Sequence, residues 1–294
     1  MQKTSPPKLF DHHRVVAKLR RVSEINKPQS DFLSRIAADT LSERLEVTNR
    51  SFETVVDLFS RFDCMADELR KSTKAKNVIS IGLHDEEKEP SKNTNRCERL
   101  LGQLDTFPFA KGTLDLVTSV IGLHWSNDLP GMMTQIRNAL KPDGLFLAAI
   151  PGNRTLTELR ECLIQAETEL TGSVSLRVDT FGEVRQLGSL LQRAGFALPV
   201  VDTDILTIRY ATLPALIDDL RAMGMTSSLA NRTKFGPRNL FTRTEEIYNQ
   251  RYRDSDGRIR ATFELVFLSG WAPDSSQQKP LKPGSAQNRL GDFL

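Results

Sequence analysis

Apolar residues along the chain form two kinds of pattern that alternate with each other. Short runs of apolar and β-branched residues predict buried strands, and apolar residues three or four positions apart predict helices with one buried face. Two amphipathic helices, near 10–25 and 31–45, precede the first strand at about 54–59. Further strands are predicted at 77–83, 99–103, 114–121, 145–150, 200–210 and 260–271.

The helices between these strands carry recognisable start and stop signals. Asp63 is expected to cap the helix after the first strand, and Asp128 to cap a helix with Pro130 in its first turn. The segment 141–144, Lys-Pro-Asp-Gly, predicts a tight turn, and Gly195 is expected to close a later helix. The remaining helices are predicted at 63–72, 155–170, 181–194, 213–220 and 242–248.

Strands that alternate with helices through short links predict an α/β fold, in which a parallel sheet is covered by helices on both faces. We expect N-terminal helices at 1–50 and a main domain at 51–273, with a helical insertion at about 213–258. The tail at 274–294 is rich in Ser, Gln, Pro and Lys and is expected to be disordered. The polar run at 85–93 predicts an exposed loop.

The charge balance argues against a nucleic-acid partner. The 294 residues include 40 basic and 37 acidic ones, which leaves a net charge of +3. The basic segment 14–21 is interleaved with apolar residues, so a solvated helix face is favoured over a membrane or nucleic-acid patch.

The cysteines and the apolar runs indicate a soluble protein of a reducing compartment. Cys64, Cys97 and Cys162 are widely spaced, form no metal-binding pattern and are expected to be free thiols. No apolar run approaches the roughly 20 residues that a transmembrane helix needs, and the N-terminus shows no secretory signal. We expect a cytoplasmic protein, with peripheral contact at the inner face of the cytoplasmic membrane left open.

The loop after the first strand raises the main functional question. A strand, a tight turn and a helix in this order mark the place where doubly wound α/β folds bind a nucleotide-like cofactor. Such turns normally contain glycine, because the backbone takes a positive φ or touches the ligand. No glycine lies between Asp57 and Asp63, which also counts against a dinucleotide-binding oxidoreductase.

Several segments taken together resemble a known family. They are 114–117 with 123–130, 140–144, 155–160, 191–196, 202–204, 220–224 and 252–257. This set is similar to the mitochondrial and alphaproteobacterial complex I (NADH dehydrogenase) assembly-factor family of class I S-adenosylmethionine (SAM) methyltransferase-like proteins. It is more remotely similar to malonyl-carrier-protein methyltransferases. The resemblance spans 10–271 and implies a Rossmann-like, mostly parallel seven-stranded sheet with a small helical cap, and a protein or carrier-protein client such as a complex I subunit.

The resemblance also implies where a cofactor would bind. The family positions at the ends of the first, second and third strands fall on these residues: Asp57, Leu58, Phe59, Gly82, Gln103 and Leu104. In the family, three glycines follow the first strand, an acid after the second strand bonds the ribose, and an acid after the third bonds the adenine amine. Here Phe59, Arg61 and Asp63 take the glycine positions, and Gly82 takes that of the ribose acid. No metal site is expected.

These departures predict that SAM binds weakly or not at all. A non-glycine residue in the left-handed region costs about 1–2 kcal/mol, and the Phe59 side chain would occupy volume that a ligand needs. The missing ribose acid removes hydrogen bonds worth about 1.5–3 kcal/mol each. The alternative is that the turn has drifted and that another loop supplies the contacts.

His124 and Trp125 follow the strand at 114–121, where the resembled fold places residues that face the transferred group. His124 could then act as a base near neutral pH, and Trp125 could form a wall of the pocket. The alternative makes His124 a hydrogen-bonded strand-end residue and Trp125 part of the core.

Two functions remain open on the sequence. The first is a methyltransferase-like protein with an eroded SAM site that acts on or holds a protein client in complex I assembly. The second is an active SAM-dependent methyltransferase that modifies a protein or carrier-protein group. Whether the chain is an enzyme is left undecided between them.

Overall fold

The computed structural model describes residues 8–25, 27, 29–84, 97–231 and 236–278. The exposed loop predicted at 85–93 and most of the tail predicted at 274–294 lie outside the described residues.

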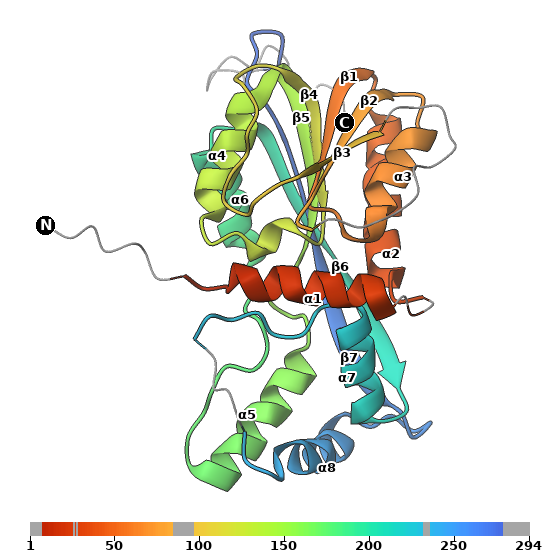
Figure 1. Cartoon of the computed structure of the whole chain (residues 1–294), viewed down its shortest axis with the longest axis vertical. Coiled ribbons are helices and arrows are strands. Elements are labelled where there is room, and N and C mark those ends of the chain that lie inside the picture. The colour runs from red at the N-terminus through yellow and green to blue at the C-terminus, as the bar shows by residue number, and fades with distance from the viewer. Residues whose placement is uncertain (1–7, 26, 28, 85–96, 232–235, 279–294) are drawn as a thin grey trace, which may run out of the picture.

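A seven-stranded sheet forms the centre of the protein, in the order β3-β2-β1-β4-β5-β7-β6 (Figure 1). The first five strands run parallel, and β7 is antiparallel to both β5 and β6. The predicted mostly parallel α/β sheet is thereby confirmed. The strands are β1 (Phe52–Leu58), β2 (Ala75–Gly82), β3 (Cys97–Leu101), β4 (Leu114–Val120), β5 (Leu140–Pro151), β6 (Ala197–Tyr210) and β7 (Ile259–Trp271).

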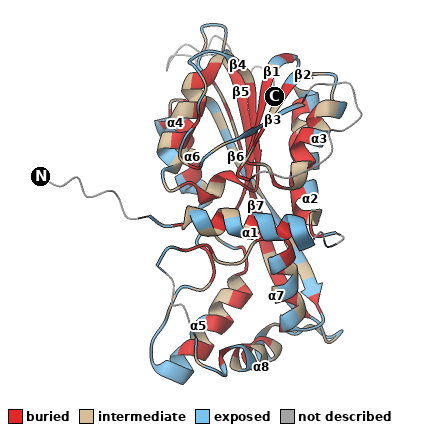
Figure 2. Ribbon diagram, viewed as in Figure 1, coloured by how far each residue is buried: buried red, intermediate tan, exposed pale blue. Residues whose placement is uncertain are grey.

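Helices cover both faces of the sheet (Figure 1). On one face lie α2 (Phe32–Val47) and α3 (Cys64–Lys71), and on the other lie α4 (Leu129–Ala139) and α6 (Val184–Arg193). Successive side chains of a strand point to opposite faces, so Val55 joins the α2 core and Val56 joins the α4 core. Both cores appear as buried bands on the two sides of the strands (Figure 2).

A second group of helices lies at the far end of the long strands β6 and β7 (Figure 1). It consists of α5 (Thr157–Thr171), α7 (Leu213–Ala222) and α8 (Leu240–Tyr252), and α5 packs on α8. The buried Tyr248 of α8 donates a hydrogen bond of 2.8 Å to the carbonyl oxygen of Arg260 in β7. The helices α7 and α8 lie within the range of the predicted insertion.

The helix α1 (His12–Ile25) crosses the molecule between the sheet layer and this lower group (Figure 1). Its positions Val15, Leu19 and Val22 are buried. The segment before it is fixed at both sides: the Phe10 amide donates to Asn127 Oδ1 at 2.8 Å, and the Asp11 amide donates to the Ser228 carbonyl at 2.8 Å. The amphipathic helix predicted near 10–25 is therefore held as a strap across the molecule.

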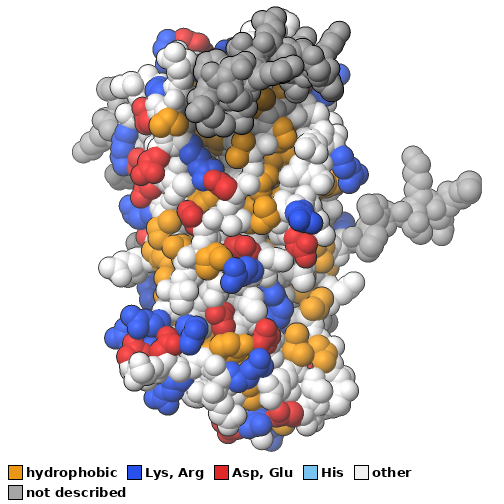
Figure 3. Space-filling view, turned by 180° about the vertical axis from the view of Figure 1, so that it is seen from behind, with side chains coloured by type: hydrophobic (Ala, Val, Ile, Leu, Met, Phe, Trp, Pro, Cys, Tyr) orange, Lys and Arg blue, Asp and Glu red, His pale blue; other side chains and the backbone are white. Residues whose placement is uncertain are grey.

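Charged side chains of both signs are interspersed with apolar ones on the face seen from behind (Figure 3). This distribution matches the near balance of basic and acidic residues in the sequence. No helix in the described ranges combines the length and the apolar character needed to cross a bilayer.

Of the helix caps and turns predicted from the sequence, some are found in the structure and others are not. Asp128 caps α4 by accepting a hydrogen bond of 2.9 Å from the Gly131 amide, and Gly195 takes the expected left-handed conformation, with φ 84°. The turn predicted at 141–144 lies within the bounds of β5 but outside its pairing with β4, since Leu140 pairs with Leu114 and the next pair is Leu145 with Leu116. The left-handed Asp143 (φ 60°) and a register shift opposite, in β4, absorb these residues as an irregular start of β5.

Asp63 stands at the predicted N-cap position of α3, but its side chain makes no capping hydrogen bond. Its backbone is left-handed, with φ 55°, and its carboxylate pairs with Arg99 at 3.1 Å. The expected cap is thus replaced by an ion pair to β3.

The helix α2 contributes five fully or nearly fully buried apolar residues to the core, so its removal from the sheet should unfold the protein. We expect Leu41→Ala to lower the free energy of unfolding by about 2–5 kcal/mol, since Leu41 has no exposed surface. Urea unfolding monitored by circular dichroism checks this. The exposed Glu43→Ala on the same helix should change it by less than about 0.5 kcal/mol. An equal effect of both changes would contradict the prediction.

Candidate functional site

The loop after β1 contains no glycine, but several of its residues have the positive φ angles that are typical of glycine. Phe59, Phe62 and Asp63 have φ angles of 57°, 58° and 55°, in the left-handed region that glycine adopts most easily. The Phe59 amide donates a hydrogen bond of 2.8 Å to the carbonyl of Ile81 in β2. The path of the loop is therefore retained at two of the three family glycine positions, while side chains have been added to it.

The Phe59 side chain fills the space between the ends of β4 and β3 and is only 3% exposed. A Cβ atom on Gly122, after β4, would lie 2.0 Å from the Phe59 carbonyl oxygen. A Cβ atom on Gly102, after β3, would lie 3.0 Å from Phe59 Cε1. Glycine is required at 122 because the loop backbone lies directly against it, and the Phe59 ring packs against Gly102 on the other side.

Arg61 closes the same region from the side of the lower helices. It is 5% exposed, and its Nη2 donates a hydrogen bond to the carbonyl of Met223, at the C-terminus of α7. A cation at a helix C-terminus is favoured by the helix dipole. The guanidinium carbon also lies 5.6 Å from the centre of the Trp125 ring, so Arg61 joins the loop, α7 and the segment after β4.

Asp57 and Leu58, which the resemblance places in the cofactor site, are enclosed within the sheet. The Oδ1 atom of Asp57 accepts hydrogen bonds from the hydroxyls of Ser60 and Thr118, and its Oδ2 has no hydrogen-bond partner among the described residues. Burial raises the pKa of Asp57 to about 7, although the two hydroxyls oppose the shift. The carboxyl group fixes the loop to β4 from inside.

His124 and Trp125 lie in a short 3₁₀ helix, η2 (Leu123–Trp125), at the end of β4. The Trp125 ring is almost fully buried, whereas His124 keeps an exposed edge and packs 5.7 Å from the ring of Phe181. His124 Nδ1 is buried and has no hydrogen-bond partner among the described residues. Burial, Lys18 and Arg61, in that order, hold the pKa of His124 well below its usual value, so the imidazole is neutral at pH 7.

Lys18 brings a second cation from α1 to this corner. Its Nζ lies 5.3 Å from the centre of the Trp125 ring and donates a hydrogen bond to the Thr226 carbonyl. Burial lowers the pKa of Lys18 to about 8, and the buried Asp179 opposes that shift. Asp179 also accepts a hydrogen bond of 2.7 Å from the Ser228 amide. Lys18, Arg61, His124 and Asp179 form a buried polar cluster beneath α1.

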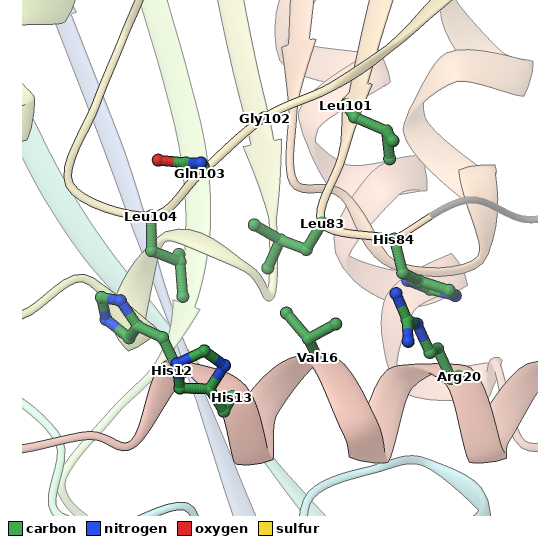
Figure 4. A pocket seen from close by; sticks show the side chains of 10 residues that line it. All are labelled: His12, His13, Val16, Arg20, Leu83, His84, Leu101, Gly102, Gln103 and Leu104. Carbon is green, nitrogen blue, oxygen red and sulfur yellow. The ribbon is translucent and has the colours of Figure 1, made fainter.

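A pocket of about 540 Å³ lies beside this cluster, at the ends of β2 and β3 and under α1 (Figure 4). Of the six expected cofactor positions, Gln103 and Leu104 line it, and Gly82 directly precedes its lining residue Leu83. The full lining is His12, His13, Val16, Arg20, Leu83, His84, Leu101, Gly102, Gln103 and Leu104.

Three histidines of this lining, His12, His13 and His84, were not predicted as site residues. His12 is half-buried, and its Nε2 lies 2.7 Å from Asn127 Nδ2 and 3.1 Å from the Trp125 carbonyl oxygen. These partners lie more than 110 residues away, so no local spacing signals the contact. Among the described residues, no three His, Cys, Asp or Glu side chains are grouped to hold a metal ion.

At the position of the family's ribose-binding acid, a positively charged side chain replaces the negative one. A Cβ atom on Gly82 would lie 3.4 Å from Nη2 of Arg99, so an arginine covers the place where an acid would stand. Phe59 and Arg61 place side chains at two of the family's glycine positions, at the other end of the cleft, where both are almost fully buried. The filled end is the one where the transferred methyl group would be held.

Comparison with known proteins defines the class of the fold and then the family. A model for a methyltransferase domain matches residues 63–148. A putative methyltransferase from Bacillus halodurans shares the fold, with a TM-score of 0.54 and 16% identity over 80% of this chain and 98% of that chain. The YcgJ protein from Bacillus subtilis does so with a TM-score of 0.56, 13% identity, and 81% and 99% coverage. The protein therefore has a class I methyltransferase fold.

Curated relatives identify the family more closely. "Arginine-hydroxylase NDUFAF5, mitochondrial" from Homo sapiens is 34% identical over 263 residues, which cover 90% of this chain and 76% of that protein. The mouse protein of the same name is 35% identical, with 90% and 77% coverage. A malonyl-[acyl-carrier protein] O-methyltransferase from Xylella fastidiosa is 34% identical over 62% of this chain and 59% of its own. The chain belongs to the NDUFAF5 family, the complex I assembly-factor family that its sequence resembles.

The buried Asp57 predicts a loss of stability with rising pH. Its folded pKa, about 7, lies above the ordinary 3.8, so the folded state binds the proton more tightly. The stabilisation is complete below the ordinary pKa and is lost as the pH rises through about 7. We expect Asp57→Asn to gain stability relative to the unaltered chain between pH 5 and pH 8, by about 2.7 kcal/mol, because pH 5 lies about two units below the folded pKa.

Chemical denaturation at both pH values measures this difference. The exposed Asp67→Asn serves as the control, because this carboxylate lies at the surface and outside the buried groups around the loop. If Asp57→Asn lost stability relative to the unaltered chain at pH 8, the carboxylate would be stabilising in its charged form and the prediction would fail.

Proposed function

We propose that this chain acts in the assembly of respiratory complex I by hydroxylating an arginine side chain of a protein client, without SAM as a methyl donor. The observation that carries the proposal is the filling of the methyl-donor end of the cleft by Phe59 and Arg61, which are 3% and 5% exposed. Membership of a family whose curated members are named arginine-hydroxylases supplies the reaction class.

Hydroxylation of a side chain requires other reactants than methyl transfer does. Hydroxylation replaces a hydrogen of the side chain by a hydroxyl group. With dioxygen as oxidant, one oxygen atom enters the product, and the other leaves as water after an external reductant has supplied two electrons and the solvent two protons. None of these steps needs a sulfonium cofactor, so an obstructed methyl-donor site is compatible with the reaction.

The buried cluster supports a particular placement of the client arginine. Lys18 and Arg61 repel a guanidinium group near His124. We therefore place the methylene chain of the arginine, and not its charged end, beside the exposed edge of His124. The neutral imidazole can form a hydrogen bond at its exposed edge and so hold the side chain in position for hydroxylation.

We also propose a client protein and a place of action for this chain. A subunit of complex I is the proposed client, and the cytoplasmic side of the membrane that holds the complex is the proposed place of contact. The relatives that carry the arginine-hydroxylase name are described as mitochondrial. Tagged protein should recover a complex I subunit from cells in which assembly has been interrupted.

We expect calorimetry to show SAM binding to the unaltered chain no tighter than the millimolar range. Phe59→Gly should tighten it at least tenfold, because the residue is already left-handed (φ 57°) and the change removes only the ring that fills the cleft. Phe62→Gly is the matched control, a second left-handed phenylalanine of the same loop (φ 58°), and should change little. Low-micromolar binding to the unaltered chain would favour the active methyltransferase instead.

Peptide mass spectrometry of complex I subunits tests the reaction itself. Cells that lack this chain should lose the added oxygen on one client arginine, and the unaltered chain should restore it. His124→Ala should fail to restore it although the tagged variant still recovers the client, whereas His13→Ala should restore it fully. An added methyl group in place of the oxygen, or no change at any arginine, would refute the proposal.

A further inference from the structure

The charged end of a client arginine needs a partner away from His124. Lys18 Nζ and the Arg61 guanidinium carbon lie 5.3 Å and 5.6 Å from the centre of the Trp125 ring, so this part of the site repels another guanidinium group. A carboxylate contacts the same segment, because Asp105 accepts hydrogen bonds from the residues that directly follow Trp125. The segment after β4 thus has cations at its indole ring and an acid at the residues beyond it.

Asp105 is held through one carboxylate oxygen and keeps the other free. Its Oδ1 accepts hydrogen bonds from the Ser126 hydroxyl at 2.6 Å and from the amides of Asn127 and Asp128 at 2.7 Å and 3.1 Å. Its Oδ2 accepts no hydrogen bond from another described residue, and 30% of the side chain is exposed. The three donors fix the direction of the carboxylate, so Oδ2 is an accessible acceptor in a defined place.

The histidine beside Asp105 does not neutralise its charge. His12 Nε2 lies 3.8 Å from Asp105 Oδ2. Asn127 Oδ1 accepts a hydrogen bond from the Phe10 amide, and Asn127 Nδ2 donates one of 3.1 Å to the Phe10 carbonyl, which fixes the orientation of the side-chain amide. Because Nδ2 also lies 2.7 Å from His12 Nε2, this ring nitrogen accepts a hydrogen bond and carries no proton. Asp105 therefore has no cationic partner in the part of the chain that the structure describes.

The free oxygen lies within reach of a side chain that passes His124. Ser126, which donates to Asp105, is two residues from His124, and two residues of backbone span at most about 7 Å. His12 and Leu104, the neighbours of the carboxylate, line the pocket of about 540 Å³, so open space adjoins it (Figure 4). A metal ion is a poorer match, because the described His, Cys, Asp and Glu side chains form no group of three that could hold one.

We propose that Asp105 binds the guanidinium group of the client arginine through Oδ2 and so selects arginine among client side chains. This assignment rests on the proposed function for the identity of the ligand, and it adds a position for the charged end to that of the methylene chain beside His124. A guanidinium group suits the site because it combines a permanent positive charge with five N–H donors and no acceptor. Asp105 is then a specificity-determining residue that takes no part in the transfer of oxygen.

Nuclear magnetic resonance titration of the full chain with the N-acetyl amides of arginine, citrulline and lysine tests the site without requiring any reaction. The arginine amide should bind at least tenfold more tightly than the citrulline amide, which has nearly the same shape and no charge, and also more tightly than the lysine amide. Asp105→Asn should abolish the preference for arginine over citrulline. Asparagine keeps an oxygen for the three donors and tolerates the left-handed backbone (φ 69°), so only the charged oxygen is replaced.

Asp128→Asn is the matched control, since it removes the same charge from an exposed neighbour and asparagine still caps α4. It should leave the preference for arginine within about twofold, and equal melting temperatures of the two variants verify that both are folded. An equal loss of preference in both variants would indicate only a long-range charge effect and overturn the site. Arginine amide that binds no more tightly than the citrulline or lysine amide would overturn it as well.

The restoration experiment in cells separates the site from the reaction. Shortly after expression is induced, Asp105→Asn should restore less than a tenth of the added oxygen that the unaltered chain restores, whereas Asp128→Asn should restore it fully. Full restoration by Asp105→Asn would overturn the site and leave the hydroxylation intact. If the unaltered chain restores no oxygen but still prefers the arginine amide in a manner that depends on Asp105, the hydroxylation is refuted and the guanidinium site is supported.

Discussion

The Phe59 carbonyl lies so close to the Gly122 backbone that no side chain fits between the end of β1 and the end of β4. This contact determines the course of the loop that follows. Because the chain must turn at once, three of the next five residues take left-handed conformations, at a cost of about 1–2 kcal/mol each. Burial of the Phe59 ring and of Arg61, with its hydrogen bond to α7, offsets that cost. The loop therefore keeps its geometry after losing the glycines that normally permit it.

Strand positions could be predicted well because a parallel sheet buries both faces, which leaves uninterrupted apolar runs such as that of β4. The turn expected at 141–144 shows the limit of local signals. Proline and glycine do interrupt regular structure there, but Lys141 pairs with Asp115 of β4 at 2.8 Å and the neighbouring strand continues alongside. These four residues therefore form an irregularity within a strand and not a link between two elements, and the strand partners on either side of it cannot be read from a single segment.

The sequence predicts where a site would lie in the fold, but it does not predict how the side chains there are arranged. The resemblance located Phe59, Gln103 and Leu104, which do surround one cleft. It could not show that the Phe59 ring points along the cleft, nor that Arg99 lies over Gly82 from the adjacent strand. Both depend on side-chain directions and strand register. His12 was not predicted as a site residue for a related reason. Its partner Asn127 is distant in the sequence, and the two meet only in the folded protein.

The strap formed by α1 has a consequence for the order of folding. Its anchor at Ser228 lies more than 200 residues further along the chain, and long loops cost closure entropy before any contact forms. During synthesis the docking surface of α1, which buries Val15 and Leu19, stays incomplete until the segment around Ser228 leaves the ribosome. The first helix made is thus among the last to be placed. Premature collapse of that helix onto the nascent sheet is the characteristic misfolding hazard of this topology.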